Sequence, residues 1–162
     1  MDEMALLERG EQVRMEPAAL WAGLDAKALR KRFAAGELTE LEFEAVVFRA
    51  QYPNWNYVRF RAEDLDALAR SFAGVPFLRN HSVGDISARD GIVTACRMDG
   101  PDGLEMRAAI RLTTPEGVRD FLAGRIDRFS IGWFKRGPNV CSVCAEDWLG
   151  GRCRHSPGQV YT

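Results

Sequence analysis

The sequence predicts an α+β fold: a small, mostly antiparallel β-barrel wrapped by helices, followed by a C-terminal zinc knuckle. Several segments alternate apolar and polar residues, as half-buried strands do, and residues 104–112 are the clearest case. Segments with helical periodicity lie between these strands, an order typical of α+β proteins. Near the C-terminal end, three cysteines lie within thirteen residues, with a histidine two positions further on.

Composition limits the class of protein. The chain has 162 residues, of which 46% are hydrophobic, enough for one domain with its own core. A net charge of −1 argues against a nucleic-acid-binding protein that relies on phosphate contacts. The sequence has no 18-residue apolar run and no signal peptide, so we expect a cytosolic protein with neither a nucleic-acid nor a membrane partner.

Three regions are expected along the chain: an N-terminal arm and helix at 1–37, a barrel core at 38–138, and a Cys/His zinc-binding segment packed on the core at 139–162. Residues 1–16 are charged and aperiodic, which indicates an arm. Pro17 suits the first turn of a helix, and apolar residues then recur at helical spacing until Gly36. We expect this amphipathic helix to dock on its own domain rather than on a partner.

The same patterns place the elements of the core. Thr39 and Glu42 fit a capping box that would begin a short turn before the first strand. Strands are predicted at residues 43–50, 57–60, 77–82, 91–98, 104–112 and 128–134, and helices at 62–73 and 114–124. A segment rich in turn residues, 99–103, joins two of the strands into a hairpin. Cys96 has apolar neighbours in this hairpin and is expected to be a core thiol.

Ser130 is the candidate nucleophile. It lies in the predicted strand 128–134, whose large apolar residues alternate with it and therefore point to the opposite face. Gly132, on the same side as Ser130, leaves open space beside the hydroxyl, as attack on a bulky substrate requires. The alternative is a serine that only fills space on a strand. His81, one of only two histidines, lies in another strand-like run and is the candidate partner.

The pattern Cys141-x2-Cys144-x8-Cys153-x-His155 supplies three thiolates and one imidazole, a set that tetrahedral Zn²⁺ accepts. A CxxC pair is the usual knuckle half of a structural zinc site. Because protein ligands would fill all four positions, we expect a structural site rather than a hydrolytic one. The alternatives are unrelated reduced cysteines, or redox chemistry at the CxxC pair.

Taken together, these motifs resemble the capsid-maturation (prohead) proteases of tailed bacteriophages, distant relatives of the herpesvirus assemblins. The order and spacing of the landmarks carry the resemblance. They are Leu38-Thr39-Glu40-Leu41-Glu42 with Val46-Val47-Phe48, the helix in 60–74, Asn80-His81-Ser82, the helix in 113–124, Phe129-Ser130-Ile131-Gly132-Trp133, and the cysteine-containing tail 141–161.

The resemblance implies a serine endopeptidase on a herpesvirus-protease-like barrel, with Ser130 as the nucleophile and His81 as the general base. Such an enzyme would cleave scaffold and capsid proteins, and itself, during maturation of the phage procapsid. It would act inside the assembling procapsid in the host cytoplasm and would form a homodimer.

The third member of the triad is left open. In the family it lies C-terminal to the serine, and assemblins use a second histidine there. His155 is such a histidine, but it also completes the Cys3His set, and we favour the metal role for it. Glu146 and Asp147 are acidic alternatives, and a residue beyond Thr162 is another.

Two other classes of function remain. The chain could be a catalytically inactive protease-like scaffold or assembly module, organised by its structural zinc site. A nucleic-acid-binding zinc module ranks last, because Arg152 and Arg154 are the only cations near the cysteine cluster.

Overall fold

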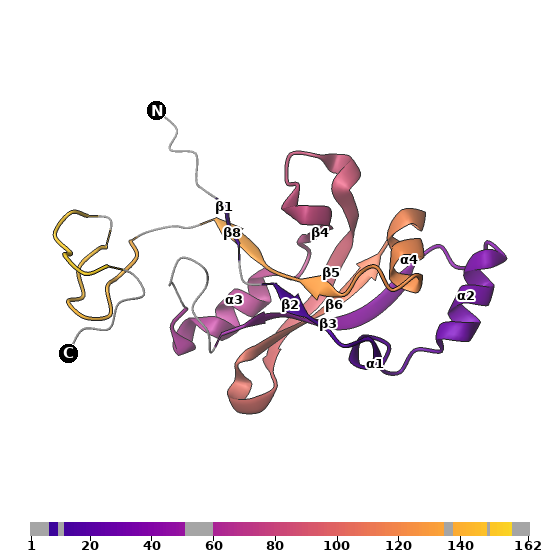
Figure 1. The fold of residues 1–162 in the computed structure, drawn as a ribbon, viewed down its shortest axis with the longest axis horizontal. Helices are drawn as coiled ribbons and strands as arrows, with labels where there is room; N and C mark the ends of the chain where they lie inside the picture. The colour runs from indigo at the N-terminus through magenta and orange to yellow at the C-terminus, as the bar shows by residue number, and fades with distance from the viewer. Residues whose placement is uncertain (1–6, 10–11, 51–59, 135–137, 149, 157–162) are drawn as a thin grey trace.

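The computed structural model describes residues 7–9, 12–50, 60–134, 138–148 and 150–156. The predicted short strand at 57–60 falls almost entirely outside these residues. The described part contains helices and antiparallel strands, so the predicted α+β class is confirmed. Figure 1 shows a body built around one long, twisted sheet, with helices at both of its ends.

The main sheet has four antiparallel strands in the order β3-β6-β5-β4. Their bounds are Leu41–Arg49 for β3, Glu105–Leu112 for β6, Arg89–Asp99 for β5 and Pro76–Leu78 for β4. The predicted hairpin is confirmed: β5 and β6 pair along their length, joined by a turn at Pro101–Gly103. Gly91 in β5 passes so close to β6 that an added Cβ would lie 2.1 Å from the Arg111 carbonyl oxygen, so only glycine fits there.

Alternation along the strands gives the sheet one apolar and one charged face. On β3, Phe43 and Ala45 are buried while Glu42 and Glu44 are exposed. The exposed glutamates pair across the sheet: Arg97 Nη1 lies 2.7 Å from Glu44 Oε1, and an arginine of β6 lies 3.4 Å from Glu42. A β-bulge between Val46 and Phe48 then places several successive side chains of β3 in the core.

Two helices follow the predicted positions closely. Helix α3, Leu65–Ser71, is preceded by a turn of 3₁₀-helix at Ala62–Asp64 and buries Leu65 and Ala69. Helix α4, Pro115–Leu122, begins at Thr114, whose side chain accepts a hydrogen bond from the Gly117 N–H at 3.1 Å. Its buried stripe of Val118, Phe121 and Leu122 joins the core cluster of the sheet.

The predicted helix from Pro17 to Gly36 is two helices instead. Helix α1 covers Pro17–Leu20 and helix α2 covers Ala26–Ala34. Gly23 between them has φ +75°, a left-handed conformation that ends a right-handed helix. The side chain of Asp25 then accepts a hydrogen bond from the Ala28 N–H and starts α2 anew. The periodic pattern spanned the break because apolar residues lie on both sides of it.

The described part of the predicted N-terminal arm contains two short strands. Strand β1, Leu7–Arg9, pairs with β8, Gly132–Phe134, and strand β2, Val13–Arg14, pairs with β7, Arg128–Phe129. The capping turn predicted at Thr39 is likewise absent: residues 37–40 are irregular, and Glu42 lies inside β3. Both errors arose because a strand pairs with distant residues that local patterns do not indicate.

The described strands do not close into the predicted barrel. Strands β3 and β4 remain the two edges of the main sheet, and the other four strands form separate two-stranded ladders. These strands are only two or three residues long, because the chain leaves the ladder at Ser130 and Ile131 between β7 and β8. Such short ladders pack over the sheet but do not provide the continuous pairing that a barrel needs.

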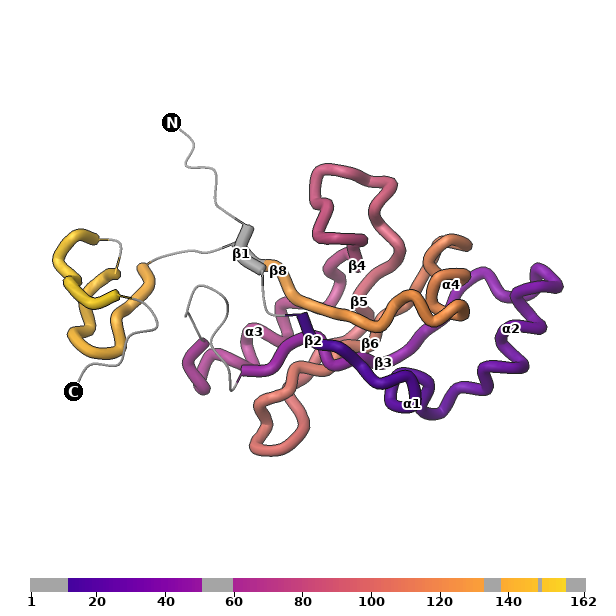
Figure 2. Tube along the Cα trace, in the orientation of Figure 1, coloured from indigo at the N-terminus to yellow at the C-terminus, as the bar shows by residue number. Residues whose placement is uncertain are grey.

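Among the described residues, no helix is both long enough and apolar enough to cross a membrane. In Figure 2, the trace of residues 138–148 and 150–156 lies apart from the sheet and makes a compact set of turns.

Candidate functional site

Ser130 lies where two short strands meet. The predicted strand 128–134 consists of β7 and β8, with Ser130 and Ile131 between them. Phe129 and Ile131 are each 3% exposed, whereas Ser130 is half-buried, so these residues follow the predicted alternation. The buried neighbours fix the backbone on both sides of the serine. Its hydroxyl therefore points to the side opposite to the Phe129 and Ile131 side chains.

His81 is not on a strand as predicted. Strand β4 ends at Leu78, and residues Arg79–His81 form a tight turn in which Asn80 does not have helical dihedral angles. Asn80 and His81 have φ of 53° and 54°, so two successive non-glycine residues adopt the left-handed conformation. This conformation costs of order 1–3 kcal/mol for each such residue and persists only where surrounding contacts hold it. The tight turn ends the strand and sets the direction of the imidazole.

The structure brings Ser130 and His81 together. His81 Nε2 lies 2.5 Å from Ser130 Oγ, although the two residues are 49 positions apart in the sequence. In the tautomer with an unprotonated Nε2, the hydroxyl donates and the imidazole accepts. This is the geometry in which a histidine removes the proton from a serine as the serine attacks.

A cluster of charged residues that sequence reasoning missed lies at the start of the turn that contains His81. Arg79 donates two hydrogen bonds to Asp90, which is 4% exposed and is the one buried polar or charged residue in the described part of the chain. Thr114 and Asp120, from the cap and body of α4, also contact this pair. The available signal was Arg79 two residues before His81, but its partner could be found only from the strand register.

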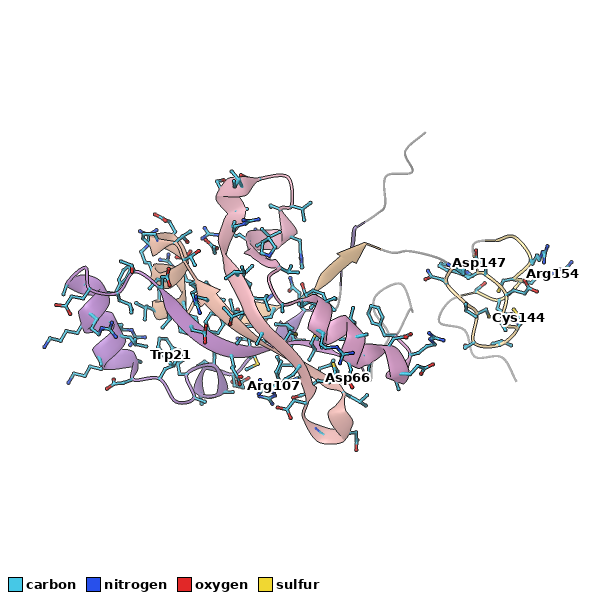
Figure 3. The ribbon with its side chains drawn as sticks, turned by 180° about the vertical axis from the view of Figure 1, so that it is seen from behind. Trp21, Asp66, Arg107, Cys144, Asp147 and Arg154 are labelled. Carbon is cyan, nitrogen blue, oxygen red and sulfur yellow. The ribbon has the colours of Figure 1, made fainter. Side chains whose placement is uncertain are left out.

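The candidates for a third triad member lie elsewhere. His155 Nδ1 is 3.6 Å from Cys141 Sγ and 3.8 Å from Cys153 Sγ, so this imidazole belongs to the cysteine cluster. Glu146 accepts a hydrogen bond from the Cys141 N–H through its backbone carbonyl, within the same segment. Figure 3 shows Asp147 in the same segment as Cys144, apart from the sheet. The contacts described for these three residues assign none of them to His81.

The four Cys/His residues form a compact cluster. One ligand atom from each of Cys141, Cys144, Cys153 and His155 lies within 4.8 Å of every other. The Cys144 and Cys153 sulfurs are 3.8 Å apart, too far for a disulfide. Tetrahedral zinc with its usual bond lengths would separate two sulfurs by ~3.8 Å and a sulfur from a nitrogen by ~3.6 Å. The set therefore fits a four-coordinate metal such as zinc.

Turns of the local backbone bring these ligands together. The Ala145 N–H donates to the Cys141 carbonyl, and Val140 bridges to Asp147, which closes the loop around the CxxC pair. Ala145 has φ 59°, as such a tight reversal requires. Backbone N–H groups of Cys144 and Val143 point at the Cys141 sulfur and lower the pKa of this thiol to about 6. A thiolate at neutral pH is the form that binds metal.

Cys96 differs from the other cysteines. It is half-buried on β5, packs against the core, and burial raises the pKa of its thiol to about 11. Because a neutral thiol is a poor nucleophile and a poor ligand, Cys96 plays the structural part that its apolar neighbours indicated.

Comparisons with protein-family models, with curated proteins and with solved structures gave no match. The features that indicate a function are the sequence motifs, the Ser130–His81 pair and the Cys/His cluster.

Proposed function

We propose that this chain is a serine endopeptidase in which Ser130 is the nucleophile and His81 the general base. The single observation that carries the proposal is the 2.5 Å approach of His81 Nε2 to Ser130 Oγ. The chain has two histidines, and His155 belongs to the cysteine cluster. Ser130 therefore contacts the histidine that is not among the ligands of the cluster.

In the proposed reaction, Ser130 Oγ attacks the carbonyl carbon of a peptide bond while His81 Nε2 takes the hydroxyl proton. The tetrahedral intermediate then collapses, the C–N bond breaks, and the imidazolium gives its proton to the leaving amine. Water, activated by the same imidazole, releases the acyl group from Ser130. The third member of the triad stays unassigned.

The proposed setting is maturation of a phage procapsid, with scaffold and capsid proteins, and the chain itself, as substrates. The sequence resemblance to prohead proteases supports this setting, as it supports the proposed homodimer and the location within the procapsid. The Cys/His cluster would hold a structural Zn²⁺, because four protein ligands leave no open position for a substrate.

The test is covalent labelling with a fluorophosphonate, which reacts with activated serines. The wild-type chain should label at Ser130, and Ser130→Ala should abolish labelling. His81→Ala should slow it by at least ~10³-fold, since nucleophile and base act as a unit. Ser87→Ala is the matched control: the Ser87 hydroxyl donates to Asp85 rather than to an imidazole, so its loss should leave labelling unchanged.

A second candidate function is that of a catalytically inactive scaffold or assembly module organised by the zinc site. The observation that favours this function is the four-ligand cluster, which lies apart from the sheet. Metal binding by this cluster does not require Ser130. A folded wild-type chain that neither labels at Ser130 nor hydrolyses an unfolded polypeptide would exclude the protease and leave this module.

A further inference from the structure

Arg79 begins the turn that contains His81, and its side chain contacts the carboxylates of Asp90 and Asp120. Its guanidinium donates from Nε to Asp90 Oδ2 and from Nη2 to Asp90 Oδ1, both at 2.9 Å. Two parallel hydrogen bonds to one carboxylate fix the plane of the guanidinium as well as its position. The first residue of the turn is therefore fixed relative to the start of β5, where Asp90 lies.

Asp90 is itself tightly held. Its Oδ1 accepts a hydrogen bond from Thr114 Oγ1 at 3.3 Å, and its backbone carbonyl accepts one from the Thr113 N–H at 3.0 Å. Helix α4 also packs closely against it, since a Cβ added at Gly117 would lie 3.1 Å from Asp90 Cβ. A buried carboxylate with this many contacts has little room to move.

The same guanidinium reaches the helix that leads to Ser130. Arg79 Nη2 lies 3.4 Å from Asp120 Oδ2 on α4, and α4 is followed by β7 and then by Ser130. Arg79 thus connects the His81 turn to the element that precedes the serine. Asp120 also pairs with Arg125 at 2.9 Å, so two arginines share one carboxylate, but only Arg79 belongs to the turn.

We propose that Arg79 and Asp90 are positioning residues that hold the His81 imidazole against Ser130. Such an anchor would help to hold the turn, because Asn80 and His81 both adopt the left-handed backbone conformation, which persists only where surrounding contacts hold it. Relaxation of either φ would swing the imidazole away from the hydroxyl. This inference rests on the proposed function for its catalytic meaning, but the positioning itself is a structural property that can be measured separately.

The experiment observes the imidazoles directly by ¹H–¹⁵N NMR, which is simple because the chain has only two histidines. Asp90→Asn keeps the shape of the side chain but removes its charge, and Arg79→Lys keeps the charge but loses the two-pronged contact. Both should move the His81 ring signals and leave those of His155 unchanged. Fluorophosphonate labelling of Ser130 should fall ~10- to 100-fold in Asp90→Asn and less in Arg79→Lys.

Arg125→Met is the matched control, because it removes the other arginine of Asp120 without touching the turn. It should leave the His81 signals and the labelling rate unchanged. The proposal is overturned if Asp90→Asn and Arg79→Lys, each still folded by its melting profile, leave the His81 signals in place. It is also overturned if Arg125→Met moves them as much. Should Asp90→Asn fail to fold, Arg79→Lys alone decides.

The two proposals fail in different ways. A wild-type chain that does not label at Ser130 contradicts the protease, whereas unmoved His81 signals contradict the positioning role. Ser130→Ala gives the reference shift for an imidazole that has lost its hydroxyl partner. Variants of Arg79 and Asp90 should move the His81 signals toward this reference.

Discussion

The sheet and the Cys/His segment are stabilised in opposite ways. In the sheet and its helices, apolar side chains such as Met106, Leu112 and Phe121 are at most 1% exposed and form one core. In residues 138–148 and 150–156, no side chain is buried, and Val140 and Val143 are mostly exposed. A segment that buries so little apolar surface needs another source of stability, and its four-ligand cluster provides a place for one.

The largest expected effect is on the Cys/His segment. We expect the purified protein to carry about one zinc ion per chain and the Cys141→Ser variant to lose it. A structural site with four ligands binds zinc with an apparent free energy of ~10–16 kcal/mol, and three ligands should not be enough to maintain this affinity. Elemental analysis measures the metal. The main melting transition of the sheet should stay within a few degrees of the wild-type value.

Cys96→Ser is the control for this substitution, because Cys96 is not part of the cluster and should not change the metal content. A metal-free wild-type protein, or a Cys141→Ser variant that retains its zinc, would contradict the metal site. Unfolding of the whole chain on chelation would contradict the separation of the two regions.

The second prediction concerns the apolar core between the sheet and its helices. Phe121→Ala should lower the free energy of unfolding by ~3–5 kcal/mol, because it leaves a cavity at a residue whose ring packs at a tilt against Phe43 and Trp21. Denaturant titration measures this loss. The zinc content of the folded variant should stay at the wild-type level, and a variant that lost both would show that the two regions unfold as one unit.

The third effect compares thiols in the two regions. Because burial raises the pKa of Cys96 to about 11 from an ordinary value of 9.0, its thiolate fraction at pH 8 should be ~100-fold below that of an ordinary cysteine. Alkylation by iodoacetamide should be slower in proportion and should accelerate about tenfold per pH unit. Cys141, with a pKa of about 6, should react fastest once the metal is removed. Equal rates at Cys96 and Cys141 would contradict this difference.

The smallest effect concerns the charged face of the sheet. The hydrogen bond from Arg97 lowers the pKa of Glu44, so the pair stabilises the fold above the unfolded-state pKa of Glu44 and loses this effect as pH falls through the folded-state value. Both side chains are about half-exposed, so Arg97→Met should cost under ~1 kcal/mol at pH 7. The cost should vanish in acid and shrink in 1 M salt. A larger, salt-independent loss would point to packing instead.

The elements that the sequence predicted well have local signals. Strand β6 of the hairpin alternates strictly and follows a segment rich in turn residues, and α4 has both an N-cap at Thr114 and a buried stripe. The elements that were mispredicted depend on distant partners. Strands β1 and β2 exist because β7 and β8 pair with them, and nothing within residues 1–16 indicates those partners.

The candidate site also contains some features that local sequence predicts and others that depend on distant contacts. Ser130, His81 and the four cluster residues could be chosen from residue type and spacing, because few other residues could supply the chemistry. The turn at Asn80 and the Arg79–Asp90 pair could not be predicted, because they arise where β4, β5 and α4 meet. The barrel was overpredicted because alternation marks strands but not their closure into a ring.

The two short ladders around Ser130 pair segments that are far apart in the chain. Strands β1 and β2 leave the ribosome before their partners β8 and β7, which come more than a hundred residues later. His81 likewise precedes Ser130 by 49 positions. Pairing over such long separations is slow compared with local hairpins. In a nascent chain, the hydroxyl and the imidazole can therefore meet only after the segment that contains Ser130 has been synthesised.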